Sequence, residues 1–197
     1  MKVDSNGEKI WEQNFGGDLS DKVLDLELTS DGGILVGGES GSGQYGNKSS
    51  LSYGSADYWI VRLDADGNKL WDRSYGGASA DLLRDIQSTA DGGFLLLGDS
   101  HSEATGSKTT PHYGTGDDWI VRLDGHGNQL WDFSLGSIDS ELTRGSLHEP
   151  SGRIMVAPDG GYLVATHSSG INPSGNKTVA GYGHSDFWVV KLRWIFP

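Results

Sequence analysis

The chain has 197 residues, no cysteine and a formal net charge of −12. The excess of acidic side chains disfavours a nucleic-acid partner, because phosphate backbones recruit lysine and arginine. Without cysteine there is no disulfide framework. No stretch approaches the roughly 20 apolar residues that would insert into a membrane.

A unit of about 60 residues repeats along the chain. The segment 57–64, Asp-Tyr-Trp-Ile-Val-Arg-Leu-Asp, returns almost unchanged at 117–124 and in part at 186–192. A fixed period of this length indicates a solenoid, a propeller or another repeat array. We expect a single domain with a closing strand at 6–15, which copies the end of the unit, and repeats at 22–74, 82–134 and 143–192.

In chain order, each repeat predicts four strands, and the second repeat displays them most clearly. Its strands are expected at 82–89, 94–98, 119–123 and 129–133, with a polar loop of about 18 residues after the second. The turns Asn6-Gly7, Asp66-Gly67 and His126-Gly127 are interpreted as two-residue hairpins, and the first two favour type I′. Four antiparallel strands per repeat predict an all-β fold, with each repeat a blade of a β-propeller.

The two ends of the chain complement each other in this scheme. The first segment supplies an outer strand without inner strands, and the last repeat supplies three strands without an outer one. Three blades are fewer than the four to eight of most propellers. We therefore expect a homodimer of six blades, in which each first strand completes the partner's last blade under two-fold symmetry.

The repeat resembles known β-propeller sequences. The run 62–71, Arg-Leu-Asp-Ala-Asp-Gly-Asn-Lys-Leu-Trp, looks like the Trp-containing repeat of quinoprotein-type propellers. The whole unit is more similar to the propeller repeats of bacterial secreted and surface proteins, which share Gly-x-Lys-Ser/Thr and then Asp-aromatic-Trp-Val/Ile-Val-Lys/Arg-Leu-Asp. The resemblance implies that Trp11, Trp71 and Trp131 pack between blades. It also implies an extracytoplasmic location, although no signal peptide is visible. The chain looks like a piece of a longer protein or a segment chosen for expression.

The long loops contain a lysine motif for which we expect a structural role. Gly46-Asn47-Lys48-Ser49 has copies at 106–109 and 175–178, and all three lack the Gly-Lys-Ser/Thr core of a phosphate loop. We expect the lysine and the hydroxyl to fix each loop in place. The aspartates that begin the Trp strands are expected to accept backbone hydrogen bonds: Asp57, Asp117 and Asp186.

Strand direction sorts the connections onto two faces, and function is expected on one of them. The hairpin turns share one face; the other face, here called the long-loop face, carries five of the six histidines. It is formed by loops 39–57, 99–117 and 167–185 and by linkers 16–21, 75–81 and 135–150.

Four residues of this face are the candidate site residues. Glu39, Asp99 and His167 take the same position in the three repeats, just after the second strand. His148 lies in an eight-residue insertion of the last linker, which breaks the symmetry of the array. Ordinary polar loop residues would give a similar composition. No catalytic motif decides between that interpretation and a ligand or metal site.

Two functions therefore stay open. The first is an extracytoplasmic binding or scaffold module that takes a small-molecule or carbohydrate ligand on the long-loop face. The alternative is a hydrolase of esters, lactones or phosphotriesters at the channel mouth, with a metal-bound water or a histidine base. Because carboxylates suit calcium and imidazole suits zinc-like ions, Glu39, Asp99 and His167 are also the candidates for a divalent-cation site.

Overall fold

The computed structural model describes residues 1–138, 152–168, 171–183 and 185–193. Every regular element in this part of the chain is a β-strand, so the predicted all-β class is confirmed. Across these ranges there is no helix with the length and apolar content to span a bilayer.

Three antiparallel sheets follow one another along the chain, each with its strands in chain order. Sheet 1 consists of β3 (Asp21–Leu28), β4 (Ile34–Ser40), β5 (Asp57–Leu63) and β6 (Lys69–Tyr75). Sheet 2 consists of β7 (Asp81–Ser88), β8 (Phe94–Ser100), β9 (Asp117–Leu123) and β10 (Gln129–Leu135). Sheet 3 consists of β11 (Arg153–Val156), β12 (Tyr162–Ser168) and β13 (Asp186–Leu192). A hairpin of two short strands precedes them: β1 (Lys2–Val3) and β2 (Lys9–Trp11).

The four strands predicted for the second repeat are confirmed as β7 to β10, each within two residues of the expected bounds. Strand β8 is buried along its whole length. Its apolar run Phe-Leu-Leu-Leu has no polar alternation because a sheet packs against each of its two faces.

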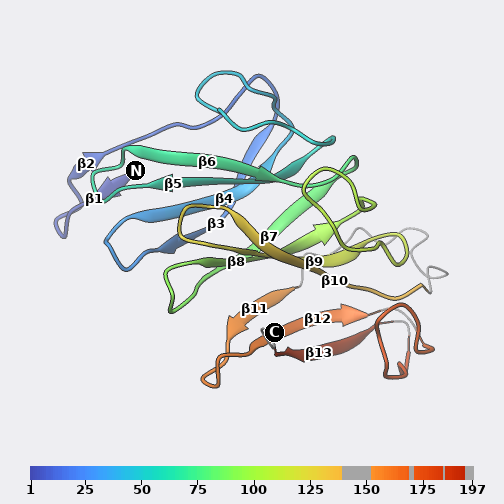
Figure 1. The fold of residues 1–197 in the computed structure, drawn as a ribbon. Coiled ribbons are helices and arrows are strands. Elements are labelled where there is room, and N and C mark those ends of the chain that lie inside the picture. The colour runs from blue at the N-terminus through green and yellow to red at the C-terminus, as the bar shows by residue number, and fades with distance from the viewer. Residues whose placement is uncertain (139–151, 169–170, 184, 194–197) are drawn as a thin grey trace.

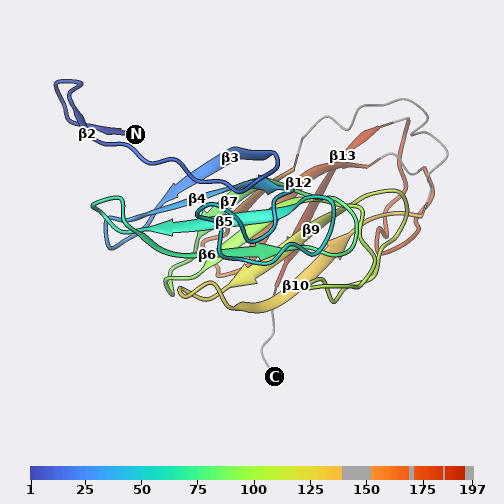
Figure 2. The same ribbon diagram turned by 90° about the horizontal axis from the view of Figure 1, so that it is seen from above.

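Within the described residues the last repeat forms the three strands expected of it, without an outer strand of its own. Its described part is a sheet of three strands, with β13 at one edge. The N-terminal strand β2 pairs with β1 and lies at the opposite end of the molecule from β13 (Figures 1 and 2). The expected closing strand therefore does not join sheet 3 of its own chain.

The hairpins are not the predicted type I′ turns. That type needs positive φ at both central residues, but within the described ranges every positive φ belongs to a glycine. In the β5–β6 hairpin Gly67, at φ 85°, donates from its N–H to Asp64 O at 3.2 Å. The Asp64 carboxylate accepts from Asp66 N at 2.9 Å and Asn68 N at 2.8 Å. An aspartate side chain thus shapes a longer turn in which only the last position requires glycine.

The sheets stack face to face in chain order, with sheet 2 in the middle (Figure 1). One core, which includes Leu35, Ile60 and Leu96, lies between sheets 1 and 2. A second core, which includes Leu97 and Val164, lies between sheets 2 and 3. In the described part of the chain the stack does not close into a barrel or a ring, so sheets 1 and 3 each meet a neighbouring sheet on one face only.

The expected packing of the tryptophans between sheets is confirmed for the two inner junctions. Trp71 packs against the core between sheets 1 and 2, and Trp131 against the core between sheets 2 and 3. The rings of Trp131 and Tyr162 have centroids 5.8 Å apart. Trp11 packs on the outer face of sheet 1, against the cluster that Trp59, Val61 and Leu63 form.

Candidate functional site on the long-loop face

The predicted division of the connections into two faces is confirmed by contacts between neighbouring sheets. On the long-loop face, Ser55 N donates to Ser79 O at 3.1 Å and Ser107 N donates to Gly76 O at 2.9 Å. Each long loop is thereby tied to the linker that enters or leaves its neighbour.

A buried lysine fixes the long loop of sheet 1, as predicted. Lys48 is only 3% exposed, and its Nζ donates to Ser50 O at 3.0 Å and to Ser74 Oγ at 2.9 Å. Burial lowers the pKa of Lys48, while the charges of Asp72 and Asp57 oppose that fall. Lys108 repeats this arrangement in sheet 2.

A buried aspartate on the outer strand is the hub of the same loop, and the sequence interpretation missed it. The Asp72 carboxylate accepts from Ser49 N and Ser50 N at 3.0 Å and from Trp59 Nε1 at 3.1 Å. Burial raises the pKa of Asp72, but hydrogen bonds led by the one from Lys69 outweigh it and hold that pKa well below its usual range. Asp132 does the same in sheet 2.

The predicted role of the aspartates that begin the Trp strands is also confirmed. Asp57 accepts from Tyr53 N at 2.7 Å, Asp117 from Tyr113 N at 2.8 Å and Asp186 from Tyr182 N at 2.8 Å. Burial raises the pKa values of Asp57 and Asp117. The long loops of sheets 1 and 2 are therefore held in place by buried, ordered groups.

The predicted site residues lie in equivalent places on different sheets. Glu39 pairs with Lys22 at 2.6 Å, and Asp99 pairs with Arg84 at 3.0 Å. His167 lies opposite Phe187 in the β12–β13 register. By strand alternation its side chain points to the face of sheet 3 turned away from sheet 2. His148 falls outside the described residues.

The structure does bring Asp99 together with a second carboxylate, Asp118, which lies directly opposite it in the β8–β9 register. Both face sheet 3. Burial raises the pKa of Asp118 to about 7 against an opposing hydrogen bond from the Thr166 hydroxyl, and the charges of Asp99 and Asp117 raise it further. Asp99, in contrast, has the Arg84 guanidinium beside it. Two neighbouring carboxyl groups with different surroundings suit proton exchange or the binding of hydroxyl groups.

The Asp118 position breaks the repeat. The residue before the strand tryptophan is Tyr58 in β5 and Phe187 in β13, both aromatic, but an aspartate in β9. Tyr58 of sheet 1 faces Gly98 of sheet 2, and Asp118 of sheet 2 faces Thr166 of sheet 3. The junction of sheets 2 and 3 thus combines two polar residues at the place where the junction of sheets 1 and 2 combines an aromatic ring and a glycine. This exchange is the sequence signal that could have identified Asp118.

Among the described residues, no three or more histidine and carboxylate side chains come together in a way that could hold a metal ion. The divalent-cation site at Glu39, Asp99 and His167 therefore stays a prediction. No family model matches the chain, and no curated protein is significantly similar to it.

Proposed function

We propose that the chain is half of a six-bladed β-propeller, formed by two copies, that serves as an extracytoplasmic binding or scaffold module. Three features support this fold: the sequence repeat, its resemblance to secreted and surface propeller repeats, and the stack of two four-stranded sheets and one three-stranded sheet, all antiparallel. In this proposal sheets 1 to 3 are consecutive blades, and β3, β7 and β11 line the central channel.

The ligand site of this proposal is the long-loop face at the junction of sheets 2 and 3. The observation that carries it is the pair of Asp99 and Asp118 beside Arg84 and Thr166, on a face whose loops are fixed by buried lysines and aspartates. A pre-ordered set of acceptors and donors suits a polyhydroxylated ligand such as a carbohydrate, because little conformational freedom is lost on binding. The net charge of −12 adds attraction for cationic substituents such as amino sugars.

A glycan array probed with the fluorescently labelled chain tests this function. The unmodified chain should bind a subset of the glycans, and the double variant Asp99→Asn, Asp118→Asn should lose that binding. His126→Ala is the matched control, because His126 lies in the β9–β10 hairpin on the opposite face. Binding that survives the double variant but is lost in His126→Ala would mean that the site lies on the face of the hairpin turns and not on the long-loop face.

A hydrolase at the same place is the second candidate, and the pKa of Asp118 near 7 favours it. A carboxyl group with that pKa can act as a general acid or base at neutral pH. Nitrophenyl esters, a lactone and a phosphotriester, each assayed with and without added calcium or zinc, test this candidate. Turnover that is absent in all of them, or is unchanged in Asp118→Asn, would leave binding as the function.

A further inference from the structure

The outer face of sheet 1 carries the same pattern of residues as the face of sheet 2 that is buried against sheet 1. Leu26 of sheet 1 is 60% exposed, whereas its counterpart in sheet 2, Ile86, is 1% exposed. The difference arises because sheet 1 covers Ile86, while in the described part of the chain no sheet covers Leu26. The outer face of sheet 1 is therefore shaped to receive another sheet of the same repeat.

Sheet 3 carries the matching half of that junction. At the junction of sheets 1 and 2, Tyr58 packs on Trp119 with ring centroids 5.1 Å apart, and the Tyr58 hydroxyl donates to Trp119 O at 3.1 Å. Gly98 leaves room for it, since a Cβ there would lie 2.7 Å from the Tyr58 hydroxyl and 2.1 Å from Leu82 O. The counterpart of Tyr58 in sheet 3 is Phe187, which is 97% exposed.

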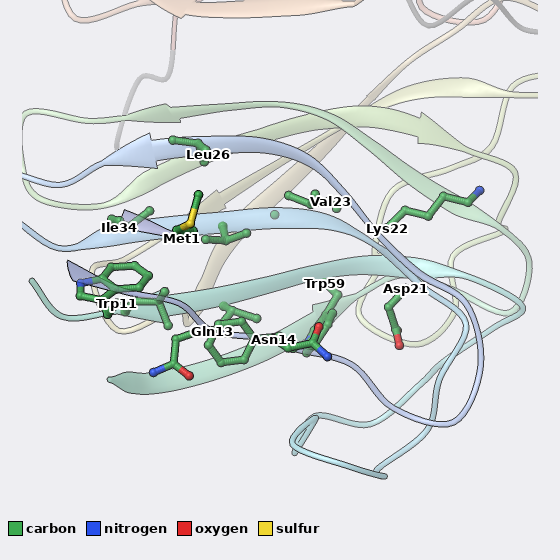
Figure 3. A pocket seen from close by; sticks show the side chains of 16 residues that line it. Met1, Trp11, Gln13, Asn14, Asp21, Lys22, Val23, Leu26, Ile34 and Trp59 are labelled. Atoms are coloured by element: carbon green, nitrogen blue, oxygen red, sulfur yellow. The ribbon is translucent and has the colours of Figure 1, made fainter. Parts of the chain in front are cut away.

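The receiving position exists on sheet 1 as a groove of about 420 Å³. Trp59 and Gly38, the counterparts of Trp119 and Gly98, both line it. Figure 3 shows Val23 and Leu26 along one side of this groove and the N-terminal segment with Trp11 along the other. An aromatic side chain from a sheet like sheet 3 fits between these walls in the way that Tyr58 fits against sheet 2.

The N-terminal strand already lies where the outer strand of that additional sheet belongs. The ring of Trp11 in β2 lies 2.8 Å from the position of a Cβ on Gly67, and Trp71 in β6 lies 2.9 Å from that on Gly127 in the next repeat. Strand β2 therefore contacts sheet 1 as β6 contacts sheet 2.

The segment after β2 repeats a second contact of the outer strands. The side-chain amide of Asn47 accepts from Gly16 N at 2.9 Å and donates to Asn14 O at 2.7 Å. After β10, the Asn176 side chain likewise accepts from Gly136 N at 3.0 Å. Strand β2 is thus fixed as the fourth strand of a sheet that would precede sheet 1.

We propose that this sheet is sheet 3 of a second copy of the chain, with β2 of one copy pairing along β13 of the other. The partner's Phe187 enters the groove between Trp59 and Gly38. The same joint forms twice in the pair and closes it. This inference rests on the two-copy ring proposed above and names the contacts that hold it together.

The register of the joint follows from the β5–β6 pairing inside the chain. There Ile60 lies opposite Arg73 and Val61 opposite Asp72, which places Val189 of β13 opposite the partner's Gln13, and Val190 opposite the partner's Glu12. Glu12 then takes the place of Asp72.

Two contacts of Asp72 show what Glu12 would do in the joint. Lys9 pairs with Glu12 at 2.9 Å, as Lys69 pairs with Asp72 at 2.8 Å. Asp72 accepts a hydrogen bond from Trp59 Nε1, and Glu12 in this register accepts one from the partner's Trp188.

Cysteine cross-linking tests the joint, because the chain has no cysteine of its own. Gln13→Cys and Val189→Cys are combined in one chain and oxidised. Opposed residues on neighbouring strands lie within disulfide reach, so denaturing gels should show a covalent species of twice 21.1 kDa. The control Gln13→Cys with His126→Cys should stay uncross-linked. A disulfide within one chain, or a ladder of longer species, would overturn the closed pair.

A second pair of variants keeps the test independent of disulfide geometry. Phe187→Asp should convert the pair to folded monomers, because this side chain is 97% exposed within one chain and its replacement leaves the inner cores intact. Leu130→Asp is the control. Leu130 and its counterpart Leu70 are both 56% exposed. Leu70 keeps this exposure although sheet 2 packs against sheet 1, so this position lies outside the junctions between sheets. A dimer that tolerates Phe187→Asp and forms no disulfide would refute this joint but not the two-copy ring. A monomeric unmodified chain would refute both.

Discussion

The raised pKa of the half-buried Asp118 carboxyl group leads to a sharp prediction about how stability depends on pH. Its pKa in the folded chain is about 7, against an ordinary value of 3.8. Because the folded-state value is raised, its stabilising contribution is complete below about pH 4 and is lost as pH rises through 7. At 1.36 kcal/mol for each pKa unit, ionised Asp118 costs roughly 4 kcal/mol at most above pH 7.

Asp118→Asn removes this cost, because the amide is neutral at every pH and its oxygen can still accept from the Thr166 hydroxyl. Urea unfolding of the unmodified chain and the variant across pH 4 to 8, followed by tryptophan fluorescence, measures the difference. The variant should gain stability as pH rises and show no gain at pH 4.

Asp124→Asn is the control with the opposite sign. Hydrogen bonds led by those from Asn128 outweigh desolvation and lower the pKa of Asp124, so the aspartate stabilises above its unfolded pKa and the variant should lose stability at neutral pH. A difference between Asp118→Asn and the unmodified chain that does not change with pH would refute the argument that burial holds Asp118 protonated.

Three further predictions concern the stack and the loops. Trp131→Ala should lower the free energy of unfolding by about 3 kcal/mol, since the ring packs on Tyr162 in the second core; a loss below about 1 kcal/mol in urea unfolding would mean that the ring is not packed. Asp72→Ala should cost about 3 kcal/mol, because it leaves buried donors unpaired, and limited proteolysis should then cut the loop at 44–53, whereas Asp66→Ala in an exposed hairpin should have neither effect. Because each copy carries a net charge of −12, added salt should tighten the pair in sedimentation experiments, and weaker pairing in salt would indicate that ion pairs hold the joint.

The fold could be predicted from the sequence to the level of strands and sheets because the same pattern of strands and turns occurs in every repeat. The apolar run at 94–98 and the Trp strands at 57–63 and 117–123 fix strand positions by burial alone. The turn type could not be predicted from Asp66-Gly67, because the side chain of Asp64, two positions earlier, decides the shape of the turn.

The candidate site could be predicted only in part, for a similar reason. A repeat pattern identifies positions that are alike, so it led to Glu39, Asp99 and His167. It carries no distances, and these three lie on separate strands of separate sheets. The pair of Asp99 and Asp118 arises from a cross-strand register and from burial under sheet 3, and neither can be read from the spacing of residues in the sequence.

The mass of the chain in solution tests the central claim most directly. The claim is that the uncovered face of sheet 1 and the uncovered face of sheet 3 belong to one junction, made twice between two copies. Light scattering coupled to gel filtration at micromolar concentration should then give one species of twice 21.1 kDa. A single species of 21.1 kDa at that concentration would contradict it.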